Sequence, residues 1–526
     1  MSEQEPQELQ EPQGPHESGG EDGAEHLDVL IVGAGISGIG AAVHLQTECP
    51  GKRYAILEAR ARLGGTWDLF RYPGIRSDSD MYTLGFAFRP WSGAKAIADG
   101  PSILRYLEET AREYGVDRAI RYGQRMERAA WSSAEGRWRV EVRDAESGAL
   151  RVITCDFLFA CTGYYRYDRG HAPKFPGSER FAGTIVHPQH WPEGLDYAGK
   201  KVVIIGSGAT AVTLVPELAK EAAHVTMLQR SPTYVISLPA EDRLANLMRG
   251  ALPERLAYGI TRWKKVAVSS LFYRASRRFP RVIRRYLLKE VRRRLPPGFD
   301  VERHFTPRYD PWDQRLCVVP DSDLFRALRS GKASVVTDHI DTFTERGIRL
   351  ASGEAIDADI IVTATGLELQ IFGGAQLSVD GRPVVPGETM AYRAMMLSGV
   401  PNMAFAMGYT NASWTLKVDL VAAYVCRLLN HMDAKGYTTC TPRRDPAVDE
   451  EPILNFSAGY VQRALPELPR AGVKRPWRVF EDYALDRVSL LHGRLEDGAM
   501  EFGRAPRAQA EGRARAAARA ATRASA

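Results

Sequence analysis

Two short glycine-rich segments have the residue types and spacing that bind phosphate groups. The first fits the pattern GxGxxG at residues 33–38, and the second fits GxGxxA at residues 206–211. In such a segment the first glycine makes a tight turn, the second lets the backbone approach a pyrophosphate, and the last small residue permits close packing of a helix. We therefore expect two dinucleotide sites. Their expected contacts are Gly33, Gly35, Ser37 and Gly38 in the first site, and Gly206, Ser207, Gly208, Ala209, Thr210 and Ala211 in the second.

The residues that follow each segment distinguish the two ligands. Glu58 lies 25 residues after Gly33, where a carboxylate can accept hydrogen bonds from both ribose hydroxyls. The same count from Gly206 reaches Ser231, which follows Arg230. An arginine beside a neutral residue suits a 2′-phosphate, which a carboxylate would repel. The first site is therefore predicted to bind FAD and the second to bind NADPH.

Each glycine segment lies between elements that would hold it in place. An apolar strand at 27–32 precedes the first segment, and a helix and a second strand follow it. The second segment is preceded by a strand at 201–205 and followed by a helix and a strand at 224–228. Two further strand-like runs end in Thr-Gly pairs at 162–163 and 365–366. Strand, turn, helix and strand in this order form a βαβ unit, so we predict an α/β fold with two Rossmann-like dinucleotide-binding domains.

The order of these elements along the chain predicts its domains. The polar, acidic residues 1–26 are expected to be a disordered leader, and the Arg/Ala-rich residues 503–526 a disordered tail. The part between them is predicted to comprise the first part of the FAD-binding domain at 27–180, an NADPH-binding domain at 181–366 with a basic helical insertion at 240–300, and the second part of the FAD-binding domain at 367–502.

Composition argues against several classes of protein. No apolar run approaches the ~18 residues that span a bilayer. The six cysteines include no CxxC pair, which disfavours a disulfide framework, a zinc site and a redox dithiol and fits the reducing cytoplasm. No metal site is expected. The net charge of +6 conceals a local excess, because residues 260–294 hold thirteen Lys and Arg and one acid.

A twelve-residue motif stands between the first two predicted domains. It satisfies F-x-G-x-x-x-H-x-x-x-W-P through Phe181, Gly183, His187 and Trp191. This pattern is the fingerprint of the type I Baeyer–Villiger monooxygenases, and the chain resembles that family. In a linker between two nucleotide domains, the histidine and the tryptophan would set or sense the relative orientation of the domains.

Other segments resemble the ethionamide-activating subgroup of this family, at 64–67, 71–78 and 408–414. The resemblance extends from about residue 27 to about residue 499. It implies the architecture of a class B flavin monooxygenase, in which NADPH reduces FAD and O2 then forms a C4a-peroxyflavin. That species converts ketones to esters or lactones, and the subgroup also oxidises sulfides and thioamides. The expected partners are O2 and a small lipophilic ketone or sulfur-containing substrate.

The resemblance also implies roles for single residues. Arg315 matches the active-site arginine of the family, and Asp78 matches the carboxylate that orients it beside the flavin. A guanidinium stays protonated at any working pH, so it suits charge stabilisation rather than proton transfer. Gln314 replaces a lysine that helps many ketone-oxidising relatives to hold NADP, which shifts that role to Arg230 and Ser231. Further contacts are implied for FAD at Thr66, Trp67, Asp78 and Met126, and for NADPH at Arg76.

Three alternative functions remain open. A flavin monooxygenase acting mainly on sulfur or nitrogen would share both domains, although the tryptophan of the motif favours the Baeyer–Villiger type. A pyridine nucleotide–disulfide reductase needs a redox dithiol near the flavin, and Cys155 and Cys161 lack that spacing. A non-enzymatic lipid- or nucleic-acid-binding module would explain the basic segment but neither glycine loop.

The basic segment at 260–294 has two interpretations. It is either a solvated helical insertion that partly covers the active site, or a surface that contacts anionic lipid at the inner face of the cell membrane. Nucleic acid is not an expected partner, because no recognised reading module accompanies the charge.

Overall fold

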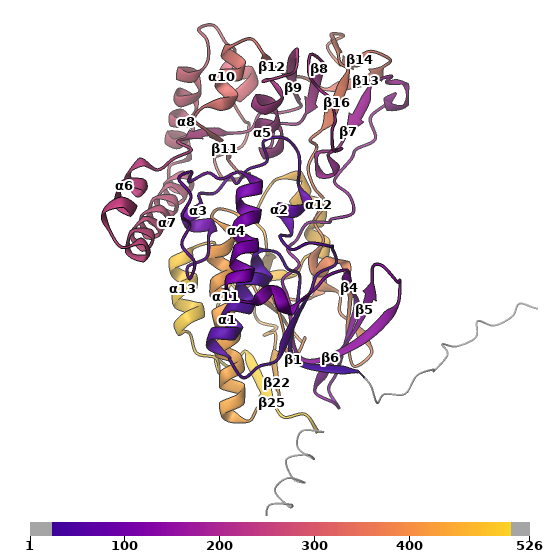
Figure 1. Cartoon of the computed structure of the whole chain (residues 1–526), viewed down its shortest axis with the longest axis vertical. Helices are drawn as coiled ribbons and strands as arrows, with labels where there is room; N and C mark the ends of the chain where they lie inside the picture. The colour runs from indigo at the N-terminus through magenta and orange to yellow at the C-terminus, as the bar shows by residue number, and fades with distance from the viewer. Residues whose placement is uncertain (1–23, 507–526) are drawn as a thin grey trace, which may run out of the picture.

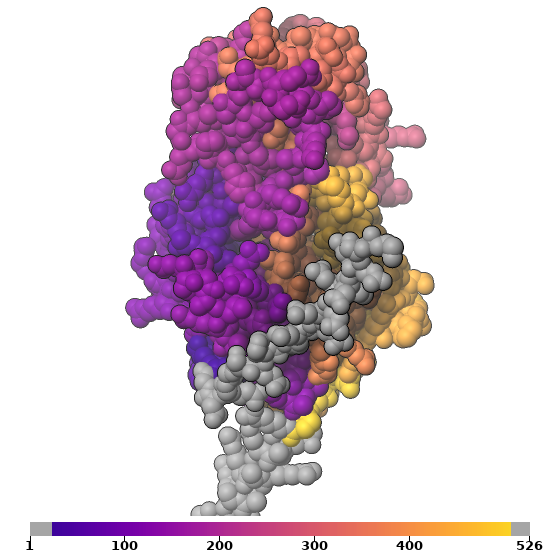
Figure 2. All heavy atoms as spheres, turned by 90° about the vertical axis from the view of Figure 1, so that its right-hand side faces the viewer, coloured from indigo at the N-terminus to yellow at the C-terminus, as the bar shows by residue number. Residues whose placement is uncertain are grey.

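The computed structural model describes residues 24–506, which form two α/β bodies stacked along the long axis of the molecule (Figure 1). Figure 2 shows the same stacking from the side. The first body contains both ends of the described chain, and the second body is formed by the middle of the chain. Among the described residues, no helix combines the length and the apolar character needed to cross a bilayer.

The first body is built on a mixed sheet that has nine strands within the described residues. These strands are β1 (Glu25–Val32), β2 (Tyr54–Leu57), β3 (Ile120–Arg121), β4 (Gln124–Ser132), β5 (Arg137–Asp144), β6 (Leu150–Ala160), β17 (Gln376–Val379), β18 (Arg382–Pro383) and β21 (Met403–Phe405). The order is β18-β17-β4-β5-β6-β1-β2-β3, with β21 paired to β6. β1 runs parallel to β2 and β6, and its central residues are fully buried, as in a sheet that is covered on both faces.

Helices cover this sheet and carry the loops that face its carboxyl edge. They are α1 (Ile36–Glu48), α2 (Thr66–Leu69), α3 (Met81–Leu84), α4 (Gly100–Glu113), α11 (Trp414–Lys435), α12 (Gly459–Ala464) and α13 (Tyr483–His492). The first body also has short 3-10 helices at Val116–Ala119, Ile371–Gly374, Pro386–Glu388 and Leu465–Glu467, and the second body has two at Ser178–Arg180 and Pro188–His190. α1 packs against α11, so the first glycine loop is held by segments that are distant in the sequence.

The second body has a five-stranded parallel sheet, again counted within residues 24–506. In sheet order its strands are β12 (Ala333–Thr337), β9 (His224–Gln229), β8 (Lys201–Ile205), β16 (Ile360–Thr363) and β7 (Thr184–Val186). α5 (Ala209–Leu218) follows β8, and α10 (Asp323–Arg329) packs against α5. Each sheet therefore contains a strand that is followed directly by a glycine loop and a helix, and the predicted α/β fold with two Rossmann-like domains is confirmed.

Smaller strand pairs complete the two bodies. They are β10 (Val235–Leu238) with β11 (Cys317–Pro320), β13 (Ile340–Thr344) with β14 (Gly347–Leu350) and β15 (Ala355–Asp357), β19 (Ala391–Tyr392) with β20 (Met396–Leu397), β22 (Thr439–Pro442) with β25 (Met500–Gly503), and β23 (Glu450–Pro452) with β24 (Arg470–Gly472).

The predicted helical insertion is formed by α6 (Arg243–Ala251), α7 (Glu254–Arg278) and α8 (Pro280–Arg294), followed by α9 (Val301–Phe305). α6 and α7 project from the side of the molecule in Figure 1. Pro280 occupies the first turn of α8, where its missing N–H costs no helical hydrogen bond, so the chain starts a new helix there. The insertion lies between strands of the second body in the sequence, but its helix α7 packs against α3 of the first body.

The ordered structure extends further at both ends than the sequence indicates. β1 begins at Glu25, inside the predicted leader, because the main chain of Glu25 and His26 pairs with β6 and Glu25 also binds Arg121. At the other end β25 includes Gly503, and the buried Ala505 donates its N–H to Thr438 Oγ1 at 2.7 Å. The remaining residues of the predicted leader and tail, 1–23 and 507–526, lie outside the described residues.

Candidate active site

A cavity of about 730 Å³ lies at the carboxyl ends of β1, β2 and β6. We call it the first cavity. Its volume is within the range of roughly 300–1,000 Å³ that is common for ligand and cofactor sites. The fold brings twelve of the predicted site residues together in its wall: Gly33, Gly35, Ser37, Glu58, Thr66, Trp67, Arg76, Asp78, Met126, Ala209, Thr210 and Arg315.

The glycines of the first loop have separate roles. Gly33 has φ +104°, and a Cβ there would lie 2.6 Å from the carbonyl oxygen of Cys161, so only glycine fits. At Gly38 a Cβ would lie 1.8 Å from the carbonyl oxygen of Gly33, so this glycine permits helix packing and does not line the cavity. Gly35 precedes the first turn of α1, which has no capping side chain and no acidic residue. The N–H groups of that turn and the helix dipole fit a pyrophosphate.

Glu58 is positioned by the backbone on either side of it. Its carboxylate is 5% exposed and accepts hydrogen bonds from the N–H of Ala34 at 2.8 Å and of Arg60 at 2.9 Å. Burial raises the pKa of Glu58, whereas the two backbone hydrogen bonds lower it. A carboxylate offers about four acceptor positions, so two remain for the hydroxyls of a ribose. The wall of the first cavity therefore fits the two ends of a dinucleotide.

Arg315 and Asp78 form an ion pair across the two bodies. Arg315 precedes β11. Its Nε lies 2.8 Å from Asp78 Oδ2 in an ion pair, and its Nη2 donates a hydrogen bond to Asp78 Oδ1 at 3.0 Å. Each side chain is about one-third exposed, and the charge of Asp78 raises the pKa of Arg315 further above its ordinary value. These two contacts restrain the guanidinium, which is a permanent cation.

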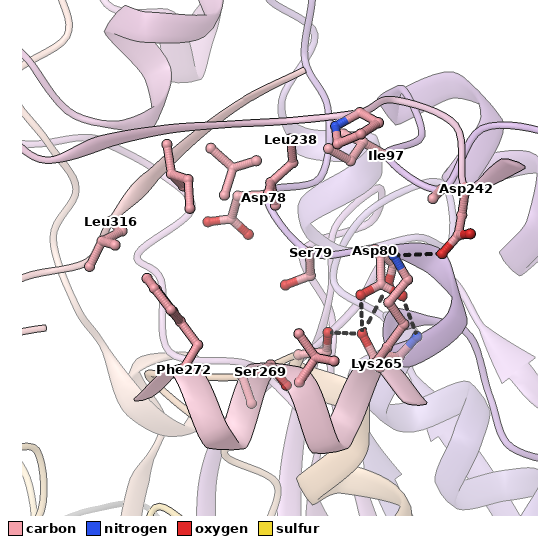
Figure 3. A pocket seen from close by; sticks show the side chains of 18 of the residues that line it. Asp78, Ser79, Asp80, Ile97, Leu238, Asp242, Lys265, Ser269, Phe272 and Leu316 are labelled. Carbon is pink, nitrogen blue, oxygen red and sulfur yellow. Dashed lines mark hydrogen bonds and ion pairs between the residues drawn. The ribbon is translucent and has the colours of Figure 1, made fainter. Parts of the chain in front are cut away.

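A second cavity of about 1260 Å³ adjoins the first, and Arg315 and Asp78 line both. Ser79, Val318 and Ala412 are also common to both walls, so the ion pair lies at the junction of the cavities. In Figure 3 Asp78 and Ser79 face Ser269 and Phe272 of α7 across the second cavity. Most of this wall is apolar. It includes Ile97, Ile236, Leu238, Phe272, Ile283, Leu316 and Leu416.

One corner of the second cavity is polar and was not predicted. There Asp80 accepts hydrogen bonds from the N–H groups of Tyr82 and Thr83, and burial raises its pKa. Lys265 of α7 lies nearby and pairs with Asp242 at 2.9 Å (Figure 3). The sequence carries one signal for this wall. Positions 265, 269 and 272 are three or four residues apart, so they share one face of the basic helix.

The second glycine loop has the local geometry of the first. Gly206 has φ +140°, and a Cβ there would lie 2.3 Å from the carbonyl oxygen of Ala364. At Gly208 a Cβ would have no neighbour within 4 Å among the described residues, so the loop is open where a phosphate would approach. Ser207 Oγ donates to the carbonyl oxygen of Ser231 at 3.0 Å, which brings the exposed Arg230 beside the loop. The N-terminus of α5 has no capping side chain either.

The predicted NADPH residues are divided between two places. Ala209 and Thr210 face the first cavity, whereas Gly206, Ser207, Gly208, Ala211, Arg230 and Ser231 line neither cavity. Arg76 lies between the bodies and donates from Nη1 to Asp323 Oδ2 at 2.5 Å. Its buried Nη2 has no hydrogen-bond partner within residues 24–506. An unpaired guanidinium nitrogen between the two glycine loops fits an anionic group such as a phosphate.

The linker motif lies away from both cavities. At Gly183 a Cβ would lie 2.3 Å from the carbonyl oxygen of Asp359, and Phe181 packs edge-on against Phe343. Burial lowers the pKa of His187, whose Nδ1 accepts a hydrogen bond from the N–H of Gln189. Trp191 packs partly buried against the core of the second body. These contacts stabilise the β7 edge of the second sheet, and none of the four motif residues lines either cavity.

Comparison with known proteins gives the family. A family model described as flavin-binding monooxygenase-like matches residues 98–257, and a model for an NAD(P)-binding Rossmann-like domain matches residues 31–95. The FAD-containing monooxygenase EthA of Mycobacterium tuberculosis H37Rv is 57% identical over 484 residues, which cover 92% of this chain and 99% of EthA. EthA of Mycolicibacterium smegmatis is 55% identical over 91% of this chain and 97% of its own length.

Solved structures give the same fold. A steroid monooxygenase solved with NADP superposes with a TM-score of 0.72 at 22% sequence identity, over 91% of this chain and all of that chain. The match to EthA has the identity and the coverage that establish common membership of a family. The chain therefore belongs to the EthA family of FAD-containing monooxygenases, which is of the Baeyer–Villiger type that the linker motif predicts.

Proposed function

We propose that this FAD- and NADPH-dependent monooxygenase inserts one oxygen atom of O2 into lipophilic ketones, giving esters or lactones, and that it also oxidises sulfides and thioamides. The observation that carries the proposal is the position of the Arg315–Asp78 pair at the junction of the two cavities. A fixed cation at that point adjoins the cofactor on one side and the substrate on the other.

The first cavity is the proposed FAD site. The N-terminus of α1 would hold the pyrophosphate, and Glu58 would accept hydrogen bonds from the ribose. Thr66, Trp67, Asp78 and Met126 would contact the rest of the cofactor. When bound and reduced, the flavin supplies the activation of O2, and the protein supplies orientation, shielding and charge.

Arg315 would stabilise negative charge that develops on the substrate. A ketone carbon that accepts a nucleophile transfers charge to its carbonyl oxygen, and a cation already in place stabilises that charge without reorganisation. The hydrogen bond and the ion-pair contact with Asp78 restrain the guanidinium from rotating away. Because Arg315 stays protonated at any working pH, it does not release a proton during the reaction. It serves as a positive charge and a hydrogen-bond donor.

The nucleotide that reduces the flavin is proposed to bind at the second glycine loop. Arg76, with its unpaired Nη2, and the loop at 206–211 would hold the phosphates, and Arg230 with Ser231 would hold the 2′-phosphate. Gln314 has no charge to contribute there, so the preference for NADPH would depend on Arg230.

The second cavity is the proposed substrate site. Its volume of about 1260 Å³ exceeds the usual range for small ligands, and most of the surface of its wall is apolar, although polar and charged residues also line it. We therefore propose substrates with long or bulky apolar groups. The test is a panel of small cyclic, long linear and aryl ketones beside a sulfide and a thioamide, with product identification and measured NADPH consumption. Turnover of sulfur compounds alone would favour the alternative function, a sulfur- or nitrogen-oxygenating enzyme.

We further propose that α6–α8 contact anionic lipid on the cytoplasmic side of the cell membrane. Eight of the thirteen cations at 260–294 form ion pairs with neighbouring acids, so charge alone does not explain this surface. Eleven of the nineteen exposed large apolar side chains in the described residues lie between Leu244 and Tyr286. On α8 the exposed Val282 and Tyr286 lie beside Arg281 and Arg285. Apolar side chains among cations suit an anionic bilayer surface.

This surface adjoins the proposed substrate site. Val268 is 61% exposed and Tyr286 is 52% exposed, and both line the second cavity, so lipophilic compounds could enter from a membrane. The test is co-sedimentation with vesicles that contain or lack phosphatidylglycerol. Leu247→Glu and Leu271→Glu should abolish binding, whereas Leu150→Glu, at an exposed site on β6, should not. Equal vesicle binding by the wild type and all three variants would contradict the proposal.

A further inference from the structure

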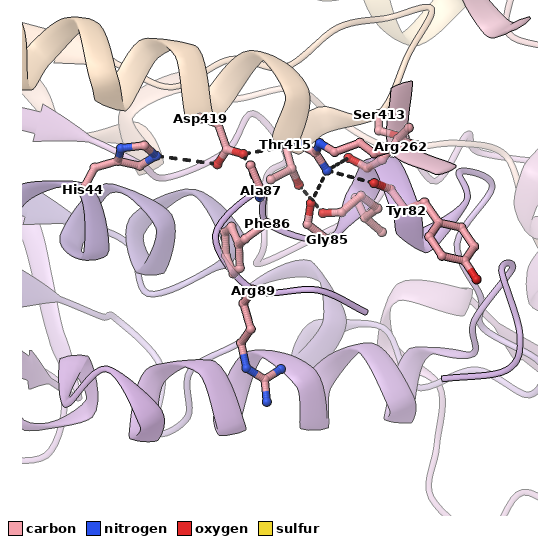
Figure 4. A network of polar contacts seen from close by, with 12 residues as sticks. His44, Tyr82, Gly85, Phe86, Ala87, Arg89, Arg262, Ser413, Thr415 and Asp419 are labelled. Carbon is pink, nitrogen blue, oxygen red and sulfur yellow. Dashed lines mark hydrogen bonds and ion pairs between the residues drawn. The ribbon is translucent and has the colours of Figure 1, made fainter. Parts of the chain in front are cut away.

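Arg262 of α7 is buried at the contact between the helical insertion and the first body. Its side chain is 9% exposed and lies one turn before Lys265, on the side of α7 that continues into the wall of the second cavity. Nη1 donates to the carbonyl oxygens of Tyr82 at 2.9 Å and Gly85 at 2.7 Å (Figure 4). A single guanidinium thus satisfies carbonyl groups at and just beyond the C-terminal end of α3, which the short helix leaves without partners.

The segment that Arg262 holds carries the acidic partner of Arg315. Asp80 caps the N-terminus of α3 through the N–H groups of Tyr82 and Thr83, and it lines the second cavity. Asp78 lies two residues earlier. α3 is only four residues long, so a shift at its C-terminal end is transmitted directly to Asp80 and Asp78.

A third element joins at the same guanidinium. Arg262 Nη2 donates to Asp419 Oδ2 of α11 at 3.4 Å, and the same oxygen accepts the N–H of Ala87 at 3.3 Å. Burial raises the pKa of Asp419, whereas Arg262 lowers it. The N-terminus of α11 is bound to the same segment, because Thr415 Oγ1 donates to the carbonyl oxygen of Leu84 at 2.5 Å. Figure 4 shows these groups converging from α7, the 82–87 segment and α11.

We propose that Arg262 is a positioning residue that holds α7, one wall of the substrate cavity, in register with the Arg315–Asp78 pair. The inference rests on the proposed function of that pair. The substrate cavity is shared between the insertion and the first body, so its shape depends on how the two are joined. Arg262 is a buried cation at that junction. It lines neither cavity itself, but it donates to the carbonyl oxygen of Thr83, a residue of the second cavity's wall, at 3.4 Å.

A matched control separates positioning from simple stability. The side chain of Arg393 is also 9% exposed and pairs with a partly buried acid, Asp497, at 2.8 Å. It further binds the hydroxyl of Tyr392 and Ser489, and it lines neither cavity. Removal of either arginine should lower the melting temperature, because each leaves a largely desolvated carboxylate without its arginine partner. Only the loss of Arg262 should alter the reaction.

The experiment compares Arg262→Met, Arg262→Lys and Arg393→Met in the flavin-loaded enzyme. The readouts are the anaerobic rate of flavin reduction by NADPH, the KM and kcat for a bulky and a small ketone, and the product formed per NADPH consumed. We expect Arg262→Met to raise the KM for the bulky ketone about tenfold and to divert NADPH to hydrogen peroxide, with flavin reduction unchanged. The values for Arg262→Lys should lie between those of the wild type and Arg262→Met, because an ammonium group keeps the charge but not the planar arrangement of donors.

Two results would overturn the inference. One is a product yield per NADPH for Arg262→Met equal to that of the wild type. The other is an equal loss of yield in Arg262→Met and Arg393→Met, which would show a general effect of stability. If Arg262→Met does not fold, Arg262→Lys is judged by the same two criteria. A wild-type enzyme that oxygenates none of the ketones or sulfur compounds would refute the proposed function itself, which is a different outcome.

Discussion

The ion pair between Arg315 and Asp78 makes a quantitative prediction for a double-mutant cycle. Asp78→Asn removes the negative charge and leaves one acceptor in place of two, so at least one of the bonds at 2.8 and 3.0 Å is lost. Two unit charges about 4 Å apart interact by roughly 1 kcal/mol in water and roughly 4 kcal/mol at an effective dielectric constant near 20. Both side chains are about one-third exposed, so we take a discounted value of about 2 kcal/mol.

That energy sets the expected size of each effect. If Asp78 acts by orienting Arg315, Asp78→Asn should slow oxygen insertion about 30-fold, since 1.36 kcal/mol corresponds to a factor of ten. Arg315→Ala removes a preorganised charge and should slow the same step by about 10²–10³. The double variant should be no slower than Arg315→Ala alone, because Asp78 then has no partner to orient. The coupling energy of the cycle is therefore expected to be about 2 kcal/mol.

The assay must isolate the oxygenation step. Each variant is reduced anaerobically with one equivalent of NADPH, mixed with ketone and O2, and analysed for ester in a single turnover. Ester yield is expressed per bound flavin, because Asp78 is itself a proposed FAD contact. The rate of flavin reduction by NADPH serves as the control and should stay at the wild-type level in all variants. Effects that add within about 0.5 kcal/mol would show that Asp78 and Arg315 act independently. That result, or full ester formation by Arg315→Ala, would refute the reasoning.

Four further predictions concern other parts of the molecule. Glu58→Gln should weaken FAD binding about 10- to 100-fold, measured by flavin retention, because a hydrogen bond to a charged group contributes about 1.5–3 kcal/mol. Arg230→Ala should raise the KM for NADPH roughly tenfold while leaving that for NADH unchanged; equal changes would disprove a phosphate contact. Deletion of 507–526 should leave purified activity and melting temperature unchanged, whereas deletion of 504–526 should lower the melting temperature, because the contact of Ala505 with Thr438 is lost. Burial lowers the pKa of His187, so the unfolded state binds its proton first and stability should fall as pH drops below about 6.5; His187→Gln should flatten this part of the pH profile of thermal unfolding.

The cofactor loops and the family could be predicted because they depend on local geometry. Glycine is required at position 33 by a positive φ and at position 38 by the close approach of the helix to the loop. Both requirements involve only a few adjacent residues, so the sequence motif shows them directly. The spacing from Gly33 to Glu58 is equally local, since it spans one βαβ unit. The motif that indicates the family is a continuous segment, although its residues pack around β7 rather than touch either cavity.

The substrate cavity could not be predicted, because its wall comes from separate parts of the chain. Asp80 lies beside α3, Lys265 on α7 and Leu416 on α11, and no local pattern relates them. The basic segment was ambiguous for a similar reason. The sequence gives the number of cations in the segment but not which acids pair with them. Two of these acids, Asp419 and Asp482, are more than 150 residues away in sequence from the arginines that they bind.

The short segment 76–78 shows what the assembled fold adds to the single residues. Arg76 binds Asp323, and two residues later Asp78 binds Arg315, so both ion pairs join the first body to the second. The partners are 247 and 237 residues away in sequence. The cation proposed for catalysis is therefore oriented only when the two bodies are in contact. Any motion that separates the bodies would break both pairs together and release Arg315 from Asp78. Access of the nucleotide and readiness for oxygen insertion are therefore linked through these two ion pairs.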